Sequence, residues 1–119
     1  MINLRSEVSQ ALNQIANVKV WNAFPKEFKS IPCIAYQEID NIPTRQSSEG
    51  EVSSLIQFNV HVFASTQSEA DQLSMDVDEK MTALGFYREG KNQQTEELKH
   101  IILRYSCEID VLTNEKFKF

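Results

Sequence analysis

The chain has 119 residues, a length typical of one domain, and its 17 acidic and 12 basic residues give a formal net charge of −5. Its lysines and arginines are scattered, so the basic face that nucleic-acid binding needs is missing, and we expect no tight binding to DNA or RNA. The longest apolar run, residues 33–36, is far shorter than the roughly 20 apolar residues of a transmembrane helix, and no apolar signal segment opens the sequence, so we expect no membrane association.

Apolar residues at steps of three and four predict a first helix over residues 4–16, with Asn3 as its N-cap and Asn17 at its end. The residues of this apolar stripe are Leu4, Val8, Ala11, Leu12 and Ile15. A short strand is expected at 18–21 and a second at 33–40. Because both faces of the second strand carry apolar side chains, it should be a central or covered strand.

Residues 41–53 differ from the segments on either side, because almost all of them are polar. We predict a polar loop here, of the length at which loops are usually functional or without structure of their own. Its composition provides little drive to fold.

The next segment alternates strongly between apolar and polar residues, which predicts a strand over 54–64. A capping box, with Thr66 as N-cap and Glu69 reaching back, then opens a second helix. Gly85 ends this helix, at a position that favours a left-handed residue.

After the second helix we predict a short strand at 86–88, a polar loop at 89–97 and a long strand at 99–111. The element order is α-β-β-β-α-β-β. This order predicts an α+β fold with a mainly antiparallel sheet and two helices on one face. We expect one domain over residues 1–111, followed by a tail at 112–119.

Signatures of catalysis are missing, since the sequence has no GxGxxG, P-loop, GxSxG or HExxH motif. We interpret His61 and His100 as surface residues of strands and Cys107 as a buried structural thiol. Cys33 lies far from Cys107, with no CxxC pair, so we expect free thiols and no zinc site. The acidic side chains of the second helix fit a solvated face rather than a metal site: Asp71, Asp76, Asp78 and Glu79. We therefore expect that the protein is not an enzyme and that it binds no cofactor and no metal.

Three segments look suited to contacts with partners: the 41–53 loop, the 89–97 loop and the aromatic tail at 112–119. The candidate contact residues are Pro43, Thr44, Arg45, Glu49 and Glu51 in the first loop, Lys91 and Asn92 in the second, and Phe117 and Phe119 in the tail. In the alternative interpretation the loops only connect strands, and the tail aromatics pack within the chain.

Four stretches of the sequence also carry a family resemblance: WNAFPKEF at 21–28, IPCIAYQEIDN at 31–41, IQFNVHVFA at 56–64 and VDEKMTALGF at 77–86. They resemble small structural proteins of long-tailed phages and prophages, in the tail terminator group, also called tail completion or tail-to-head joining proteins. The resemblance covers residues 2–111 and rests on structural phrases rather than on an active site.

The resemblance implies a hexameric ring that sits on the end of the tail tube, stops its polymerisation and presents a surface to the head connector. The implied partners are other copies of the chain, the tail tube protein and the head completion or connector protein. The implied location is the head-proximal end of the virion tail, with assembly in the cytoplasm of the bacterial host. A loop at 41–53 that orders only on contact would delay assembly until the tube end is available.

In such a ring, DNA would pass through the lumen without being bound. Six copies of a chain with charge −5 carry −30, and we hypothesise that an anionic lumen repels the phosphates. The glutamates considered for the lumen are Glu49, Glu51, Glu89, Glu96 and Glu97.

Two alternatives stay open. The first is a head-closure or minor tail protein of the same kind of virion. The second is a small ferredoxin-like ligand-binding or regulatory module, which would need a cleft with convergent polar groups. The sequence has no glycine-rich turn that would build such a cleft.

Overall fold

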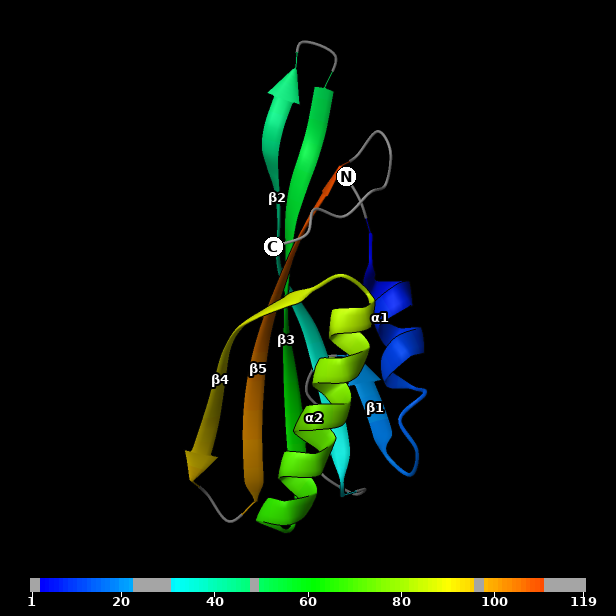
Figure 1. Ribbon diagram of the computed structural model, residues 1–119, viewed down its shortest axis with the longest axis vertical. Helices are drawn as coiled ribbons and strands as arrows, with labels where there is room; N and C mark the ends of the chain where they lie inside the picture. Colours follow the sequence, from blue (N-terminus) through cyan, green and yellow to red (C-terminus); the bar gives the residue numbers. More distant parts are fainter. Residues whose placement is uncertain (1–2, 23–30, 48–49, 96–97, 111–119) are drawn as a thin grey trace.

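A computed structural model describes residues 3–22, 31–47, 50–95 and 98–110, and Figure 1 shows two helices beside one twisted sheet. The elements are α1 (Arg5–Leu12), β1 (Lys19–Asn22), β2 (Cys33–Ser47), β3 (Gly50–Ala64), α2 (Gln67–Ala83), β4 (Tyr87–Thr95) and β5 (Lys99–Asp110). They follow one another in the predicted order, so the α+β prediction is confirmed. The proposed tail at 112–119, and with it Phe117 and Phe119, lies outside the described residues, as does Glu49.

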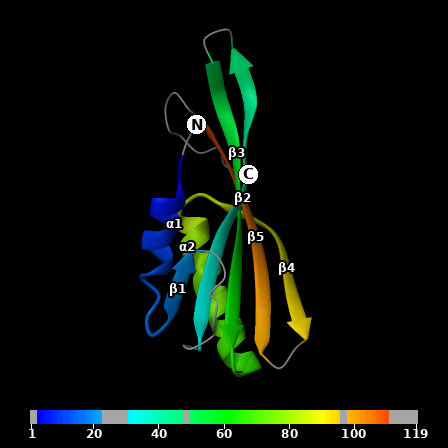
Figure 2. The same ribbon diagram turned by 180° about the vertical axis from the view of Figure 1, so that it is seen from behind.

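The five strands form one sheet in the order β1-β2-β3-β5-β4. The β2–β3, β3–β5 and β4–β5 pairs are antiparallel, and only β1 pairs with its neighbour in parallel. Figure 2 shows the sheet from behind, with α2 on its far side and α1 beside the β1 edge. α2 packs on β3, β4 and β5, while α1 packs on α2 and β1. The predicted placement of both helices on one face is therefore confirmed.

The main core lies between this helical layer and the sheet. On α2 its buried side chains are Ala70, Leu73, Val77 and Met81, and on α1 they include Val8 and Leu12. Phe58 of β3 meets Phe86 edge to face, with ring centroids 5.7 Å apart. Burying apolar side chains of this size contributes about 1.5–3 kcal/mol each, which makes this layer the main source of stability.

α2 begins and ends as its sequence predicts. Thr66 Oγ1 accepts a hydrogen bond from the Glu69 N–H at 3.2 Å, and Glu69 Oε1 reaches back to the Ser65 N–H at 3.4 Å. At the other end Gly85 has φ 95°, and the Phe86 N–H donates to the Met81 carbonyl at 3.1 Å. This is a Schellman ending, which requires a left-handed residue where the glycine stands.

α1 is shorter than predicted, since it ends at Leu12 rather than at residue 16. Residues 13–17 continue as turns, and Asn17 closes them with φ 60°. Asn3 Oδ1 accepts a hydrogen bond from the Arg5 N–H at 3.0 Å, although the N-cap position itself is Leu4. A short helix gains little from its own hydrogen bonds, so tertiary packing sets where it ends.

The two polar segments predicted as loops are strands, and this is the main correction to the sequence-based prediction. Residues 41–47 of β2 pair with 50–56 of β3, from Asn41 opposite Ile56 to Ser47 opposite Gly50. Residues 90–95 of β4 pair with 99–104 of β5. Backbone hydrogen bonds hold a hairpin or an edge strand without a buried face, so low apolar content did not exclude strands here.

Candidate assembly surface

The hairpin formed by the outer parts of β2 and β3, residues 41–56, projects past the helices as an arm (Figure 1). Among the described residues β5 accompanies β3 as far as the Ser53–Asp110 pair, and beyond it the described part of the arm pairs only β2 with β3. Irregularities between Glu38 and Asp40 and between Pro43 and Gln46 interrupt the ladder on the β2 side. Bulges of this kind raise the local twist and bend the strand.

The arm contains the predicted contact residues of the first polar segment. Pro43 is exposed and lies opposite Ser54, and Arg45 lies opposite Ser53. Glu51 lies opposite Gln46 near the tip. Pro43, Arg45 and Glu51 are therefore brought onto one projecting element, as strand residues rather than as loop residues.

Thr44, also predicted as a contact residue, fastens the base of the arm to the body of the sheet. Its hydroxyl lies 2.7 Å from the Ser53 hydroxyl and donates to Glu108 Oε1 of β5 at 2.9 Å. Ser53 is fully buried, so its hydroxyl needs this partner. The structure thus gives Thr44 a role in positioning the arm.

Exposed apolar side chains lie on the β2 side of the arm and at its base. Ile42 is 42% exposed and lies opposite Leu55, and Ile39 is 38% exposed. The sequence-based prediction placed Ile39 on an apolar face of the strand at 33–40, but it missed Ile42 because residues 41–53 were predicted as a polar loop. The signal for Ile42 was available, since it is one of the few apolar residues of that segment.

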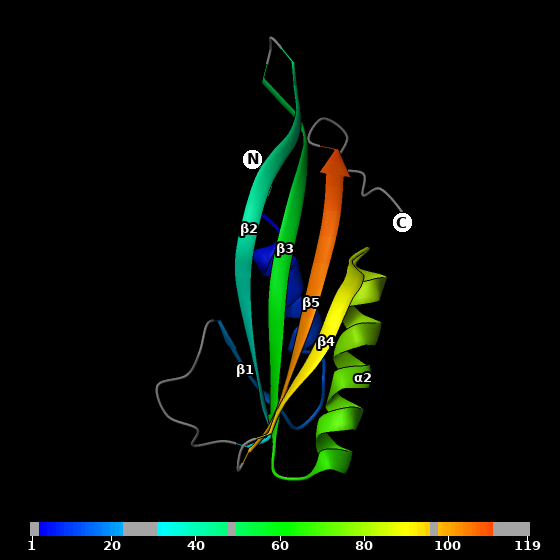
Figure 3. The same cartoon turned by 90° about the vertical axis from the view of Figure 1, so that its left-hand side faces the viewer.

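Below the arm, a polar cluster covers the sheet face that lies opposite the helices. Figure 3 shows the sheet from the side, with α2 on one side of the strands. Glu89 sits at an irregularity of β4 and its Oε1 accepts a hydrogen bond from the Ser106 hydroxyl. Gln57 Nε2 donates to Ser106 Oγ at 3.1 Å and approaches Glu89 Oε1 at 3.4 Å. Burial and the neighbouring Glu89 charge raise the pKa of Tyr87, which reaches the same carboxylate.

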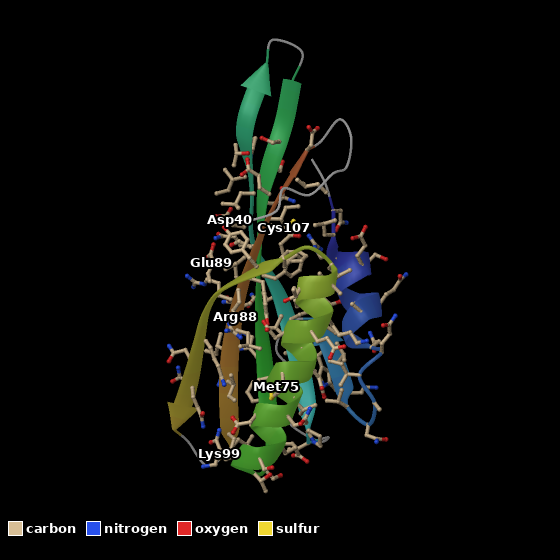
Figure 4. All side chains as sticks on the ribbon, viewed as in Figure 1. Asp40, Met75, Arg88, Glu89, Lys99 and Cys107 are labelled. Atoms are coloured by element: carbon tan, nitrogen blue, oxygen red, sulfur yellow. The ribbon has the colours of Figure 1, made fainter. Side chains whose placement is uncertain are left out.

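A shallow hollow of about 470 Å³ adjoins this cluster, and Lys91 and Asn92 of the second predicted segment line it. Asn59 and Arg104 line its other side, with Arg104 Nε 3.5 Å from Asn59 Oδ1. Lys91, Asn92 and Arg104 are exposed, and Figure 4 shows Glu89 where β4 bends. The lining of the hollow includes one acidic, two basic and two amide side chains on the strands of the sheet. This mixture suits contacts with a polar protein surface.

His61 is not the surface residue predicted from the alternation. Only 6% of it is exposed, and its Nδ1 lies 2.9 Å from His100 Nε2. Burial, followed by the charge of His100, lowers the pKa of His61 to about 4. The prediction failed because this face also carries apolar side chains, including Cys33 and Phe63, which form a second small core.

Asp78 also differs from the prediction of a solvated acidic helix face. Asp71 and Glu79 are exposed as expected, but Asp78 is half-buried and accepts a hydrogen bond from the Tyr105 hydroxyl at 2.8 Å. Its Oδ1 also lies 3.5 Å from Arg88 Nη1 of β4, the residue labelled in Figure 4. Burial and this carboxylate raise the pKa of Tyr105.

Neither cysteine takes part in a disulfide, and both are fully buried, as predicted for Cys107. Burial raises the pKa of the Cys33 thiol, which keeps it protonated and unreactive. Among the described residues, no three His, Cys, Asp or Glu side chains gather as metal ligands would. Neither described helix has the length and apolar character needed to cross a membrane.

Fold and surface together define an α+β unit with a helical layer on one face of a five-stranded sheet and a projecting hairpin. A solved structure described as that of the bacteriophage SPP1 gp17 protein is similar to it, with a TM-score of 0.54 and 19% sequence identity. The match covers 94% of this chain and 91% of the phage protein, so the two share a fold over nearly their whole length. No protein-family model matches the chain, and no curated protein matches it by sequence.

Proposed function

We propose that this protein is a structural virion protein of a long-tailed phage or prophage, which caps the tail tube, ends its polymerisation and joins the tail to the head connector as a hexameric ring. The observation that carries the proposal is the fold likeness to a phage protein over 94% of the chain. It agrees with the independent resemblance of the four sequence stretches to tail terminator proteins.

The geometry supports a role in assembly. The outer part of the arm projects past the helices, Thr44 fixes its base, and Ile42 remains 42% exposed on it. A partner that covers Ile42 would remove this apolar surface from water, which favours the contact. We assign the arm to contacts with a neighbouring copy or with the tail tube.

We propose no catalytic reaction and no cofactor for this protein. The two thiols are buried, and His61 is buried beside the rings of Phe63 and His100. The hollow beside Glu89 is shallow and lined mostly by exposed side chains, which supports a protein contact better than the enclosed site of a small ligand. The ferredoxin-like ligand-binding alternative therefore has less support.

An anionic lumen is part of the proposal, because DNA would have to pass the ring without binding. Of the glutamates considered for it, Glu89 has a described side chain, and it lies on the sheet face opposite the helices. That face also carries the exposed Arg104. The hypothesis thus requires the ring to turn the acidic part of the surface towards its axis.

Negative-stain electron microscopy of the purified protein, with and without tail tubes, tests the proposal. We expect rings of the tube's diameter and caps on tube ends. Binding to heads but never to tube ends would favour the head-closure alternative. A monomer that ignores both tubes and heads would contradict a role in the virion.

A further inference from the structure

Both edges of the described sheet end in a strand whose outer side is unpaired. β1 forms one edge and β4 the other, and no described strand pairs with the outer side of either. Such an edge presents a line of N–H and C=O groups that another strand can pair with.

Four lines of directly paired residues cross the whole sheet from β1 to β4. Their ends are Lys19 and Gln94, Val20 and Gln93, Trp21 and Asn92, and Asn22 and Lys91. The two edges therefore lie at the same level along the strands. Because β1 is parallel to β2 and each later neighbour is antiparallel, β1 and β4 run in opposite directions.

We propose that β1 of one copy pairs antiparallel with residues 91–94 of β4 of a second copy. The contact is heterologous, since each copy offers β1 on one side and β4 on the other. Such contacts form a ring when the successive rotations between neighbours lead back to the first copy. The inference deepens the proposed function by naming the subunit contact of the ring, and it rests on that function.

One register extends the four lines of paired residues from one copy into the next. In this register the side chains of the two edges are compatible. Lys19 then faces Gln94, and Lys91 faces Asn22, so each lysine meets an amide. Like charges placed directly opposite each other destabilise a strand pair, and this register has none. Sliding the strands by three residues would bring Lys19 opposite Lys91 and create such a pair, which disfavours that alternative register.

The outer side of β2 above Tyr36 is a weaker candidate for the same contact. This outer side becomes accessible where β1 stops. The register of β2 with β3, however, shifts between Glu38 and Asp40 and again after Pro43. β1, by contrast, pairs with β2 from Lys19 to Asn22 without a shift. A regular strand continues a sheet better than a bulged one.

Cysteine cross-linking of the Asn22→Cys/Lys91→Cys variant tests the contact. Both residues are exposed and end the same line across the sheet, and the native Cys33 and Cys107 are fully buried. Under mild oxidation we expect a ladder of cross-linked species up to the size of the ring, with more than half of the chains linked. Each single variant should stop at dimers.

The matched control is Asn22→Cys/Asp71→Cys, whose second cysteine lies on the exposed side of α2. It should give no ladder, and circular dichroism should show that every variant folds like the parent. If the test pair gives no more cross-linking than this control at concentrations where rings form, the edge contact is overturned.

Electron microscopy of the same oxidised samples separates the inference from the proposed function. A ladder together with capped tubes supports both. A ladder without capped tubes supports the edge contact and contradicts the tail role. Capped tubes without a ladder support the tail role and overturn the edge contact.

Discussion

The Tyr105 hydroxyl of β5 donates a hydrogen bond to Asp78 Oδ1 of α2 at 2.8 Å. The pair joins the helical layer to the sheet, since Tyr105 is fully buried and Asp78 is half-buried. Arg88 of β4 lies 3.5 Å from the same carboxylate oxygen. The packing of α2 on the last two strands therefore includes a polar contact as well as apolar burial.

Replacing Tyr105 by Phe removes this hydrogen bond and leaves the ring in place. We expect the free energy of unfolding to fall by about 1–2 kcal/mol, because a half-buried carboxylate loses a donor. Urea denaturation measures the change. Glu79→Gln, on the exposed side of the same helix, is the control and should stay within about 0.5 kcal/mol. Equal effects of the two substitutions would contradict the role of the pair.

The buried His61 predicts a loss of stability in acid. Its pKa is about 4 in the folded protein, below the ordinary 6.5, so the unfolded chain binds more protons between these values. Stability from this group is fully present above pH 6.5 and falls as the pH drops towards 4. The lowered pKa of His61 corresponds to a total loss of about 3 kcal/mol in the free energy of unfolding once the pH is below both values.

Unfolding free energies measured at pH 7.5, 5.5 and 4.5 test this dependence. The His61→Gln variant has no titrating group at this position, so its stability should change less over the same range. If the variant and the parent lose stability in parallel, other groups cause the acid sensitivity.

Ile42 should matter for assembly more than for folding. Because it is 42% exposed, we expect Ile42→Ser to lower the free energy of unfolding by less than about 0.5 kcal/mol. If the arm contacts a partner, the same change should reduce capping of tail tubes at least about fivefold, since burying an isoleucine contributes more than 1 kcal/mol. The control is Met75→Ser, which is 67% exposed on α2 and should leave capping unchanged.

Shortening the arm tests its function as a whole. Replacing residues 45–52 by Asn-Gly keeps Thr44 and Ser53 and closes the hairpin with a favoured two-residue turn. We expect the variant to fold, because the cores lie below the tip. In phage assembly it should give tails of uncontrolled length or tails that fail to join heads. Normal length and joining would show that the arm is dispensable.

Local sequence signals were enough to predict some elements. α2 was predicted from the apolar step of three and four residues, the Thr66 cap and Gly85. Strong alternation of apolar and polar residues predicted β3 from residue 54 onward. These signals work because a helix or strand that buries one face must repeat its apolar residues at the period of that structure. The order of the elements, and with it the α+β class, followed from them.

Other features were decided only by the tertiary structure. The arm and β4 are strands because backbone pairing with a neighbour holds them, and pairing across the sheet leaves no pattern in a polar segment. His61 is buried because Cys33 and Phe63 share its face, and Asp78 turns inward because Tyr105 lies beside it. The level at which β1 and β4 end likewise depends on the register of all five strands. Contacts between residues far apart in the chain set these features, and no local pattern in the sequence records them.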